Sequence, residues 1–197
     1  MQIMRANEYN DQHVREKFSK TFVDGFGEDL RYFAEDKEKL AKALKHMFVL
    51  ENFYIAVVDE DIAAITFCSD GDKLAIQHNQ KELRKHLGWL KGTIANVVFK
   101  KEFQKPPVKK GEKIANVGFV ATAEKYRRKG IASTLIDYIL SLPQYETFLL
   151  ETIADTNIGA LQLYKNLGFK EIKRTKQKHT TFSGIHYYID MAYKRNE

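Results

Sequence analysis

A short basic segment, Arg127-Arg128-Lys129-Gly130, stands between an apolar run and a helical pattern. The apolar run from Ile114 to Val120 predicts a strand, and the apolar residues that follow Gly130 recur at helical spacing. A strand that leads directly into a helix places free backbone N–H groups and the positive end of the helix dipole at one point. Such a point binds anions, and arginine and lysine side chains suit phosphate oxygens. The segment therefore predicts a pyrophosphate-binding turn.

The first turn of the predicted helix is built from small residues. Gly130, Ala132 and Ser133 leave the main chain bare, so that a phosphate can approach it closely. Pro143 ends the helix, because proline cannot continue it. The alternative interpretation is an ordinary strand, turn and helix whose basic residues are merely solvated.

A second strand and helix follow further along the chain. Phe148 to Ile153 is rich in residues that favour strands. The pattern Asn157-x-x-Ala160-x-x-x-Tyr164-x-x-x-Gly168-Phe169 then begins with a good N-cap residue and ends with a typical C-cap glycine. At about 100° per residue, Asn157 and Tyr164 lie two turns apart on nearly the same helix face, and Ala160 leaves room between them for a ligand.

Together the two patterns resemble the motifs of the GNAT acetyltransferase superfamily. Arg127-x-x-Gly130-x-Ala132 resembles its acyl-coenzyme A signature, Gln/Arg-x-x-Gly-x-Gly/Ala, and the pattern from Asn157 to Phe169 resembles its downstream motif. The resemblance is clearest from Ile114 to Ala192. It implies an α/β fold with a twisted mixed sheet, two central strands that splay apart, helices on both faces and acetyl-CoA in the splay. We expect residues 1–197 to form a single domain of this fold.

The resemblance also implies roles for individual residues. Backbone groups of Val120 and Thr122 would hold the pantetheine arm, and Asn157 would bond to it. Tyr164 would stand near the sulfur as general acid, although a core aromatic residue is the alternative. The pyrophosphate would be bound by Arg127, Arg128, Lys129, Gly130, Ile131, Ala132 and Ser133.

The sequence indicates the general base less clearly than the residues that bind the cofactor. An amine of the lysine type has a pKa near 10.4, so that only about one molecule in 10³ is neutral at pH 7 and a base assists the reaction. Glu151 lies on the strand that should border the acceptor, where partial burial would raise its pKa. A surface or salt-bridged carboxylate is an equally good interpretation of Glu151.

The expected activity is transfer of an acetyl group from acetyl-CoA to a primary amine of a small molecule or peptide. The alternative is a GNAT-fold protein that binds coenzyme A without catalysis, as a sensor or a partner of another protein. Nothing in the sequence decides the acceptor, and a homodimer is compatible with it.

Composition and charge narrow the possible partners, location and cofactors of the protein. The net charge of +6 comes from basic residues mixed with acidic ones, so we expect no nucleic-acid partner. The sequence has no apolar run of membrane-spanning length and one cysteine, Cys68, which together favour a reducing cytoplasm and no membrane association. The histidines show no metal-ligand spacing, and no metal is expected.

Outside the two motifs, hydrophobic periodicity gives a coarse order of elements. Val14 to Gly25 and Leu30 to Met47 are expected to be helical, and Phe53 to Val58 and Ile62 to Cys68 to form a hairpin. The remaining expectations are a short charged helix or loop at Lys81 to Leu90, a helix or strand at Ile94 to Phe103, and two final strands, Lys170 to Lys178 and Ile185 to Tyr193, joined near Thr180 to Gly184.

Overall fold

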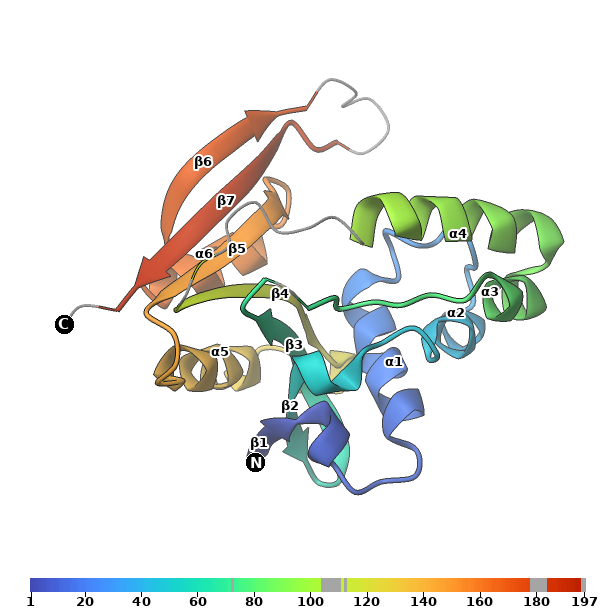
Figure 1. The fold of residues 1–197 in the computed structure, drawn as a ribbon, viewed down its shortest axis with the longest axis horizontal. Helices are drawn as coiled ribbons and strands as arrows, with labels where there is room; N and C mark the ends of the chain where they lie inside the picture. Colours follow the sequence, from blue (N-terminus) through green and yellow to red (C-terminus); the bar gives the residue numbers. More distant parts are fainter. Residues whose placement is uncertain (72, 104–110, 112, 178–183, 196–197) are drawn as a thin grey trace.

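The computed structural model describes residues 1–71, 73–103, 111, 113–177 and 184–195 (Figure 1). Within these residues, seven strands form one mixed sheet in the order β1-β2-β3-β4-β5-β7-β6. Only β4 and β5 are parallel, and the other neighbours are antiparallel. The strands are β1 (Gln2–Arg5), β2 (Phe53–Val58), β3 (Asp61–Ser69), β4 (Ile114–Thr122), β5 (Thr147–Ala154), β6 (Lys170–Lys176) and β7 (Tyr187–Lys194).

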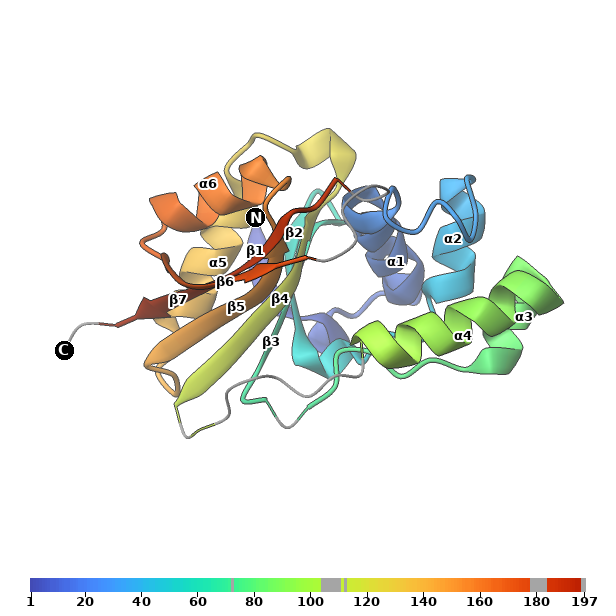
Figure 2. The same cartoon turned by 90° about the horizontal axis from the view of Figure 1, so that it is seen from above.

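Helices cover both faces of the sheet, as Figure 2 shows. Helices α5 and α6 lie against one face, and α1 to α4 gather on the other. Their bounds are α1 (Val14–Phe26), α2 (Lys37–Leu44), α3 (Gln80–Leu87), α4 (Trp89–Phe103), α5 (Ile131–Ser141) and α6 (Ile158–Asn166), with the 3₁₀ turns η1 (Ala6–Glu8), η2 (Leu50–Asn52) and η3 (Glu124–Tyr126). The predicted α/β fold is confirmed.

Each layer of helices has its own apolar core. Phe18 and Phe22 of α1, four residues apart, pack with Phe48 and Phe53 on one face of the sheet. On the other face, Leu135 and its neighbours in α5 share an apolar core with Phe148 and Leu150 of β5. Because both faces are buried, the central strands are held firmly in place.

The two central strands separate halfway along their length. The parallel pairing of β4 with β5 runs from Ile114↔Thr147 to Val117↔Leu150 and then ends. Beyond that point β4 stays paired with β3 as far as Thr122, while β5 stays paired with β7 as far as Ala154. The splay that the sequence resemblance implied is therefore present.

A β-bulge lies on each strand just beyond the last shared pair. Between Gly118 and Ala121, β4 has one more residue than β3, and between Leu150 and Ile153, β5 has one more than β7. Phe119 (φ 48°) and Thr152 (φ 56°) occupy the left-handed region within these bulges. Bulges bend their strands and redirect side chains, so both strands change course where they part.

Several expectations for the N-terminal half need correction. Residues 30–36 were expected to be helical, but α2 begins at Lys37 because the Asp36 side chain accepts a hydrogen bond from Lys39 N at 3.0 Å and caps the helix there. This helix ends at Leu44 rather than Met47. The ambiguous segment from Ile94 to Phe103 belongs to α4.

The charged segment from Lys81 to Leu90 divides into two elements. It contains most of α3 and the start of α4, which are separated at Gly88 (φ 84°). The short edge strand β1 was not expected from the sequence. The connection expected near Thr180 to Gly184 falls mostly outside the described residues.

Candidate active site

A pocket of ≈ 240 Å³ lies between the N-terminal ends of α5 and α6, at the end of β4. The segment from Tyr126 to Ser133 forms most of its wall, and α6 contributes two residues. Its lining residues are Thr122, Tyr126, Arg128, Gly130, Ile131, Ala132, Ser133, Gly159 and Leu163. Six of the ten residues that the sequence assigned to the cofactor therefore meet in one place, and one wall comes from the helix of the second motif.

The wall of this pocket at the start of α5 is bare main chain. Gly130 is the N-cap residue, with φ 76° in the left-handed region, and no side chain caps the helix. A Cβ atom added at Gly130 would meet nothing within 4 Å. The first N–H groups of α5 have no partner within the helix, and they are available to an anion in the pocket.

The basic side chains of the turn have different surroundings. Arg128 lines the pocket. The Arg127 guanidinium donates to the Asp24 carbonyl of α1 and, at 3.5 Å, to the Thr122 carbonyl. The Lys129 ammonium lies 5.3 Å from the centroid of the Tyr126 ring. The structure thus gives Arg127 a role in joining the turn to α1, and phosphate binding by Arg127 or Lys129 stays a prediction.

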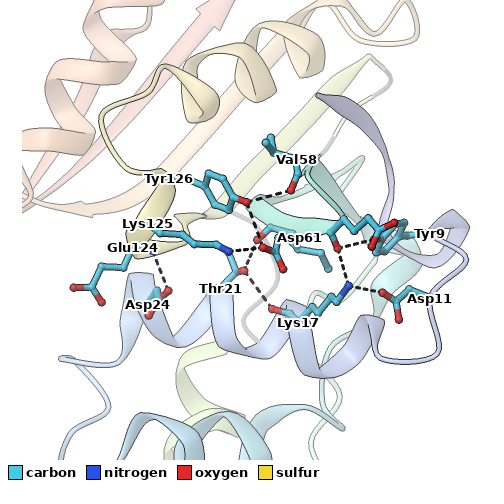
Figure 3. Close-up of polar contacts among 12 residues, drawn as sticks. Tyr9, Asp11, Lys17, Thr21, Asp24, Val58, Asp61, Glu124, Lys125 and Tyr126 are labelled. Atoms are coloured by element: carbon cyan, nitrogen blue, oxygen red, sulfur yellow. Dashed lines mark hydrogen bonds and ion pairs between the residues drawn. The ribbon is translucent and has the colours of Figure 1, made fainter.

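Acidic residues hold the η3 turn from the side of α1 and the β2–β3 hairpin (Figure 3). Asp24 of α1 accepts a hydrogen bond from Glu124 N at 3.0 Å. Asp61 of β3 pairs with the Lys125 ammonium and accepts the Tyr126 hydroxyl at 3.3 Å, and the hydrogen bond from Lys125 lowers the pKa of this carboxyl group. Lys125 is thereby paired with Asp61, and it is not among the residues that line the pocket.

Asn157 caps α6, as its position in the sequence predicted. Its Oδ1 accepts a hydrogen bond from Ala160 N at 3.2 Å, and the residue is exposed. Neither Asn157 nor Val120 lines the pocket described above. Their contacts with the pantetheine arm stay predictions.

Tyr164 is buried on α6, with 5% of its surface exposed. Its ring packs on Phe169, with the two centroids 5.8 Å apart. Burial raises the pKa of Tyr164 well above its usual value of about 10, so the hydroxyl keeps its proton at neutral pH. A protonated hydroxyl suits a proton donor, and the aromatic packing also fits the core interpretation.

Glu151 follows the last residue of β5 that pairs with β4. It is half-buried and lines a second pocket, of ≈ 170 Å³, between β5 and the β6–β7 hairpin. Asp190 and Lys173 line the same pocket, together with Leu149, Leu150, Ile172 and Met191. Asp190, which is 9% exposed, was not predicted from the sequence as a residue of the site. An aspartate within the apolar run from Tyr187 to Tyr193 is nevertheless a signal of a buried polar group.

Two further observations concern the described part of the chain. It contains no cluster of three or more histidine, cysteine, aspartate or glutamate side chains arranged to hold a metal ion. None of its helices combines the length and the apolar character needed to cross a membrane.

Residues 29–169 match the model of the acetyltransferase (GNAT) family. The chain belongs to this family. The match includes both sequence motifs and both central strands, and it confirms the resemblance inferred from the sequence.

Individual relatives agree with this assignment. A curated relative, N-alpha-acetyltransferase 30 of Dictyostelium discoideum, is 32% identical over 97 residues, which are 48% of this chain and about half (50%) of the relative's length. An N-acetyltransferase from Staphylococcus aureus Mu50 shares the fold, with a TM-score of 0.62 and 16% identity over 98% of this chain and 100% of its own. The ribosomal-protein-S18-alanine N-acetyltransferase of Escherichia coli gives a TM-score of 0.55 and 14% identity, over 100% and 94% of the two chains.

Proposed function

We propose that this protein is an acetyl-CoA-dependent N-acetyltransferase that acts on a primary amine. The observation that carries the proposal is the pocket between α5 and α6, which joins both sequence motifs next to the splay of β4 and β5. Membership of the GNAT family supports the same reaction.

The residues of this pocket fit coenzyme A. A pyrophosphate carries two or more negative charges, and the turn offers it main-chain N–H groups, the dipole of α5 and the Arg128 guanidinium. Gly130 and Ala132 leave space for the phosphate to reach the backbone. The pantetheine arm would extend from there past Thr122 toward the splay.

When bound, acetyl-CoA supplies an acetyl group on a thiol, which at a pKa of about 8.5 is a fair leaving group. In the proposed reaction, the backbone of Val120 and Thr122 orients the thioester by hydrogen bonds. Glu151 accepts the proton that the attacking amine loses, directly or through water. The buried Tyr164 hydroxyl donates a proton to the sulfur, and it has that proton available because of its raised pKa.

The acceptor is a small molecule or a peptide with a primary amine. The named activity of the Dictyostelium relative is N-alpha-acetylation, and that of the Escherichia coli structure is acetylation of an alanine of a ribosomal protein. These names make peptide α-amines one arm of the acceptor panel, alongside polyamines, aminoglycosides and lysine ε-amines.

The proposal is tested by following thiol release from acetyl-CoA across that panel, with coenzyme A binding measured in parallel. Amine-dependent thiol release by the wild type, with acetylated amine found by mass spectrometry, is the expected result. Binding of coenzyme A without turnover on any amine would favour the non-catalytic alternative. Absence of binding would contradict both.

A further inference from the structure

The bulge in β5 is held by a side chain from the neighbouring strand. The Thr152 N–H of the bulge donates a hydrogen bond of 2.8 Å to Oδ1 of Asp190 in β7. We infer that Asp190 is a positioning residue for acetyl transfer, which fixes the bulge and so holds Glu151 beside the splay. This inference rests on the proposed function, in which Glu151 is the base.

The register of β5 and β7 shows that the Asp190 side chain takes the place of a backbone hydrogen-bond partner. Leu150 pairs with Met191 and Ile153 pairs with Ile189, so that Glu151 and Thr152 together stand opposite the single residue Asp190. A bulge of this kind disrupts the backbone ladder and leaves its extra residue without a backbone partner. The Asp190 carboxylate supplies the acceptor that the ladder no longer offers to Thr152 N–H.

The backbone of Thr152 needs such support. Its φ of 56° lies in the left-handed region, which is a genuine outlier for a β-branched residue. Conformations of this kind persist only where the surrounding structure imposes them. A hydrogen bond to a carboxylate is stronger than one between neutral groups, and it can hold the backbone in this conformation.

The burial of Asp190 also supports a role in holding the bulge. Only 9% of its surface is exposed, and its neighbours along β7, Ile189 and Met191, belong to the apolar core. Burying a carboxylate is unfavourable unless it is hydrogen-bonded, and an apolar residue would suit the packing better. The hydrogen bond to Thr152 is thus a reason for an aspartate at this position.

Loss of this bond has a defined consequence for Glu151. Side chains alternate between the faces of a regular strand, and a bulge redirects the side chains within it, so the bulge sets the direction in which Glu151 points. Glu151 and Asp190 now line the same pocket, at the point where β5 leaves β4. If Thr152 relaxes to an extended conformation, Glu151 leaves that position.

The test uses four variants of the full chain: Asp190→Ala, Asp190→Asn, Thr152→Gly and the double variant Asp190→Ala/Thr152→Gly. We expect Asp190→Ala to lower kcat about tenfold or more, with the KM for acetyl-CoA changed by less than about twofold, because a small misplacement of a reacting group is costly while the cofactor pocket is unaffected. Asp190→Asn should keep most of the activity, since its amide oxygen can accept the same N–H. The double variant should regain activity, because glycine adopts a positive φ without support.

Hydrogen exchange supplies a readout that does not depend on turnover. The Thr152 amide should lose protection in Asp190→Ala and keep it in Asp190→Asn. The inference is overturned if kcat is unchanged in Asp190→Ala or if Asp190→Asn lowers kcat as much as Asp190→Ala. It is also overturned if the double variant is no more active than Asp190→Ala. A wild type that transfers no acetyl group to any amine instead overturns the proposed function, so the two failures are distinguishable.

Discussion

Tyr164 and Arg128 have different roles in the proposed reaction, and their surroundings differ accordingly. Tyr164 is almost removed from solvent, which keeps its hydroxyl protonated. Arg128 has a backbone φ of 59° and lines the pocket at the start of α5. One residue therefore offers a proton and the other a fixed positive charge.

Replacement of Tyr164 by phenylalanine removes the proton donor and keeps the packing on Phe169. We expect kcat to fall about 10- to 100-fold and the KM for acetyl-CoA to change by less than about threefold, because the hydroxyl acts on the leaving thiolate rather than on cofactor binding. Steady-state kinetics measure both constants. In the wild type, the raised pKa means that no loss of activity from Tyr164 ionisation should be seen below about pH 10. An unchanged kcat in the variant would show that water protonates the thiolate.

Arg127 and Arg128 form a matched pair of identical, adjacent side chains. Arg128→Ala should raise the KM for acetyl-CoA about tenfold, by loss of a charge-assisted hydrogen bond, and the effect should shrink at high salt. Arg127→Ala should mainly lower the free energy of unfolding, by about 1 kcal/mol, since it breaks contacts with Asp24 and Thr122. Kinetics at two salt concentrations and thermal unfolding separate these outcomes. Equal effects on the KM would contradict the different roles.

Among the elements, α1 approaches the end of β4 very closely. A Cβ atom at Gly25 would lie 2.5 Å from the Cβ of Ala121, which is next to the pocket residue Thr122. This contact brings α1 near enough for Asp24 to bond to the η3 turn. Helix α1 on one face of the sheet thus supports the η3 turn beside the pocket.

Gly25→Ala tests this close approach. Overpacking should lower the free energy of unfolding by about 1–3 kcal/mol, although alanine favours helices by about 1 kcal/mol over glycine. Gly159→Ala is the control, because it lies in α6 and its added Cβ would meet nothing within 4 Å. Chemical denaturation should show a loss of stability at position 25 and none at 159. A more stable Gly25→Ala variant would mean that α1 is not in close contact with β4.

The junction between α2 and α3 carries a pH-sensitive contact. His46 Nε2 accepts a hydrogen bond of 3.0 Å from Asn79 N, at the N-cap of α3, which requires a neutral ring. Burial lowers the pKa of His46 below its usual 6.5. The nearby Glu82 carboxylate opposes this shift to a smaller extent. Below pH 6.5 the unfolded chain takes up a proton that the folded chain resists, so folding stability falls as the pH falls.

Denaturation curves at pH 7.5 and 5.5 measure this effect. The loss of stability between the two values should be smaller in His46→Gln, whose side chain can accept the Asn79 N–H and does not titrate. An equal loss in both proteins would assign the acid sensitivity to other groups.

For the whole molecule, local sequence signals located the elements that carry the motifs. The predicted strand beginning at Ile114, the helix beginning at Ile131 and the helix of the second motif were confirmed, because small residues, caps and periodicity act over a few positions. The start of α2 at Lys37 was missed although Asp36 is a good N-cap, since apolar residues from Leu30 onward suggested a longer helix.

Long-range contacts explain what the sequence did not reveal. The pairing of Arg127 with Asp24 joins residues 103 positions apart, and that of Asp190 with Thr152 joins residues 38 apart. No local pattern predicts the positive φ of Thr152, because threonine normally favours an extended strand. The elements that form the pocket were therefore predictable from local sequence signals, and the long-range contacts that hold these elements were not.

The central claim is that coenzyme A binds at the Gly130 turn, and calorimetric titration with acetyl-CoA tests it most directly. Gly130→Glu places a negative side chain in the proposed phosphate site, whereas Gly88→Glu makes the same change at a glycine that also has a positive φ and open surroundings. We predict that the wild type and Gly88→Glu bind alike and that Gly130→Glu binds at least about 100-fold more weakly. Equal binding by all three proteins, or no binding by the wild type, would contradict the account.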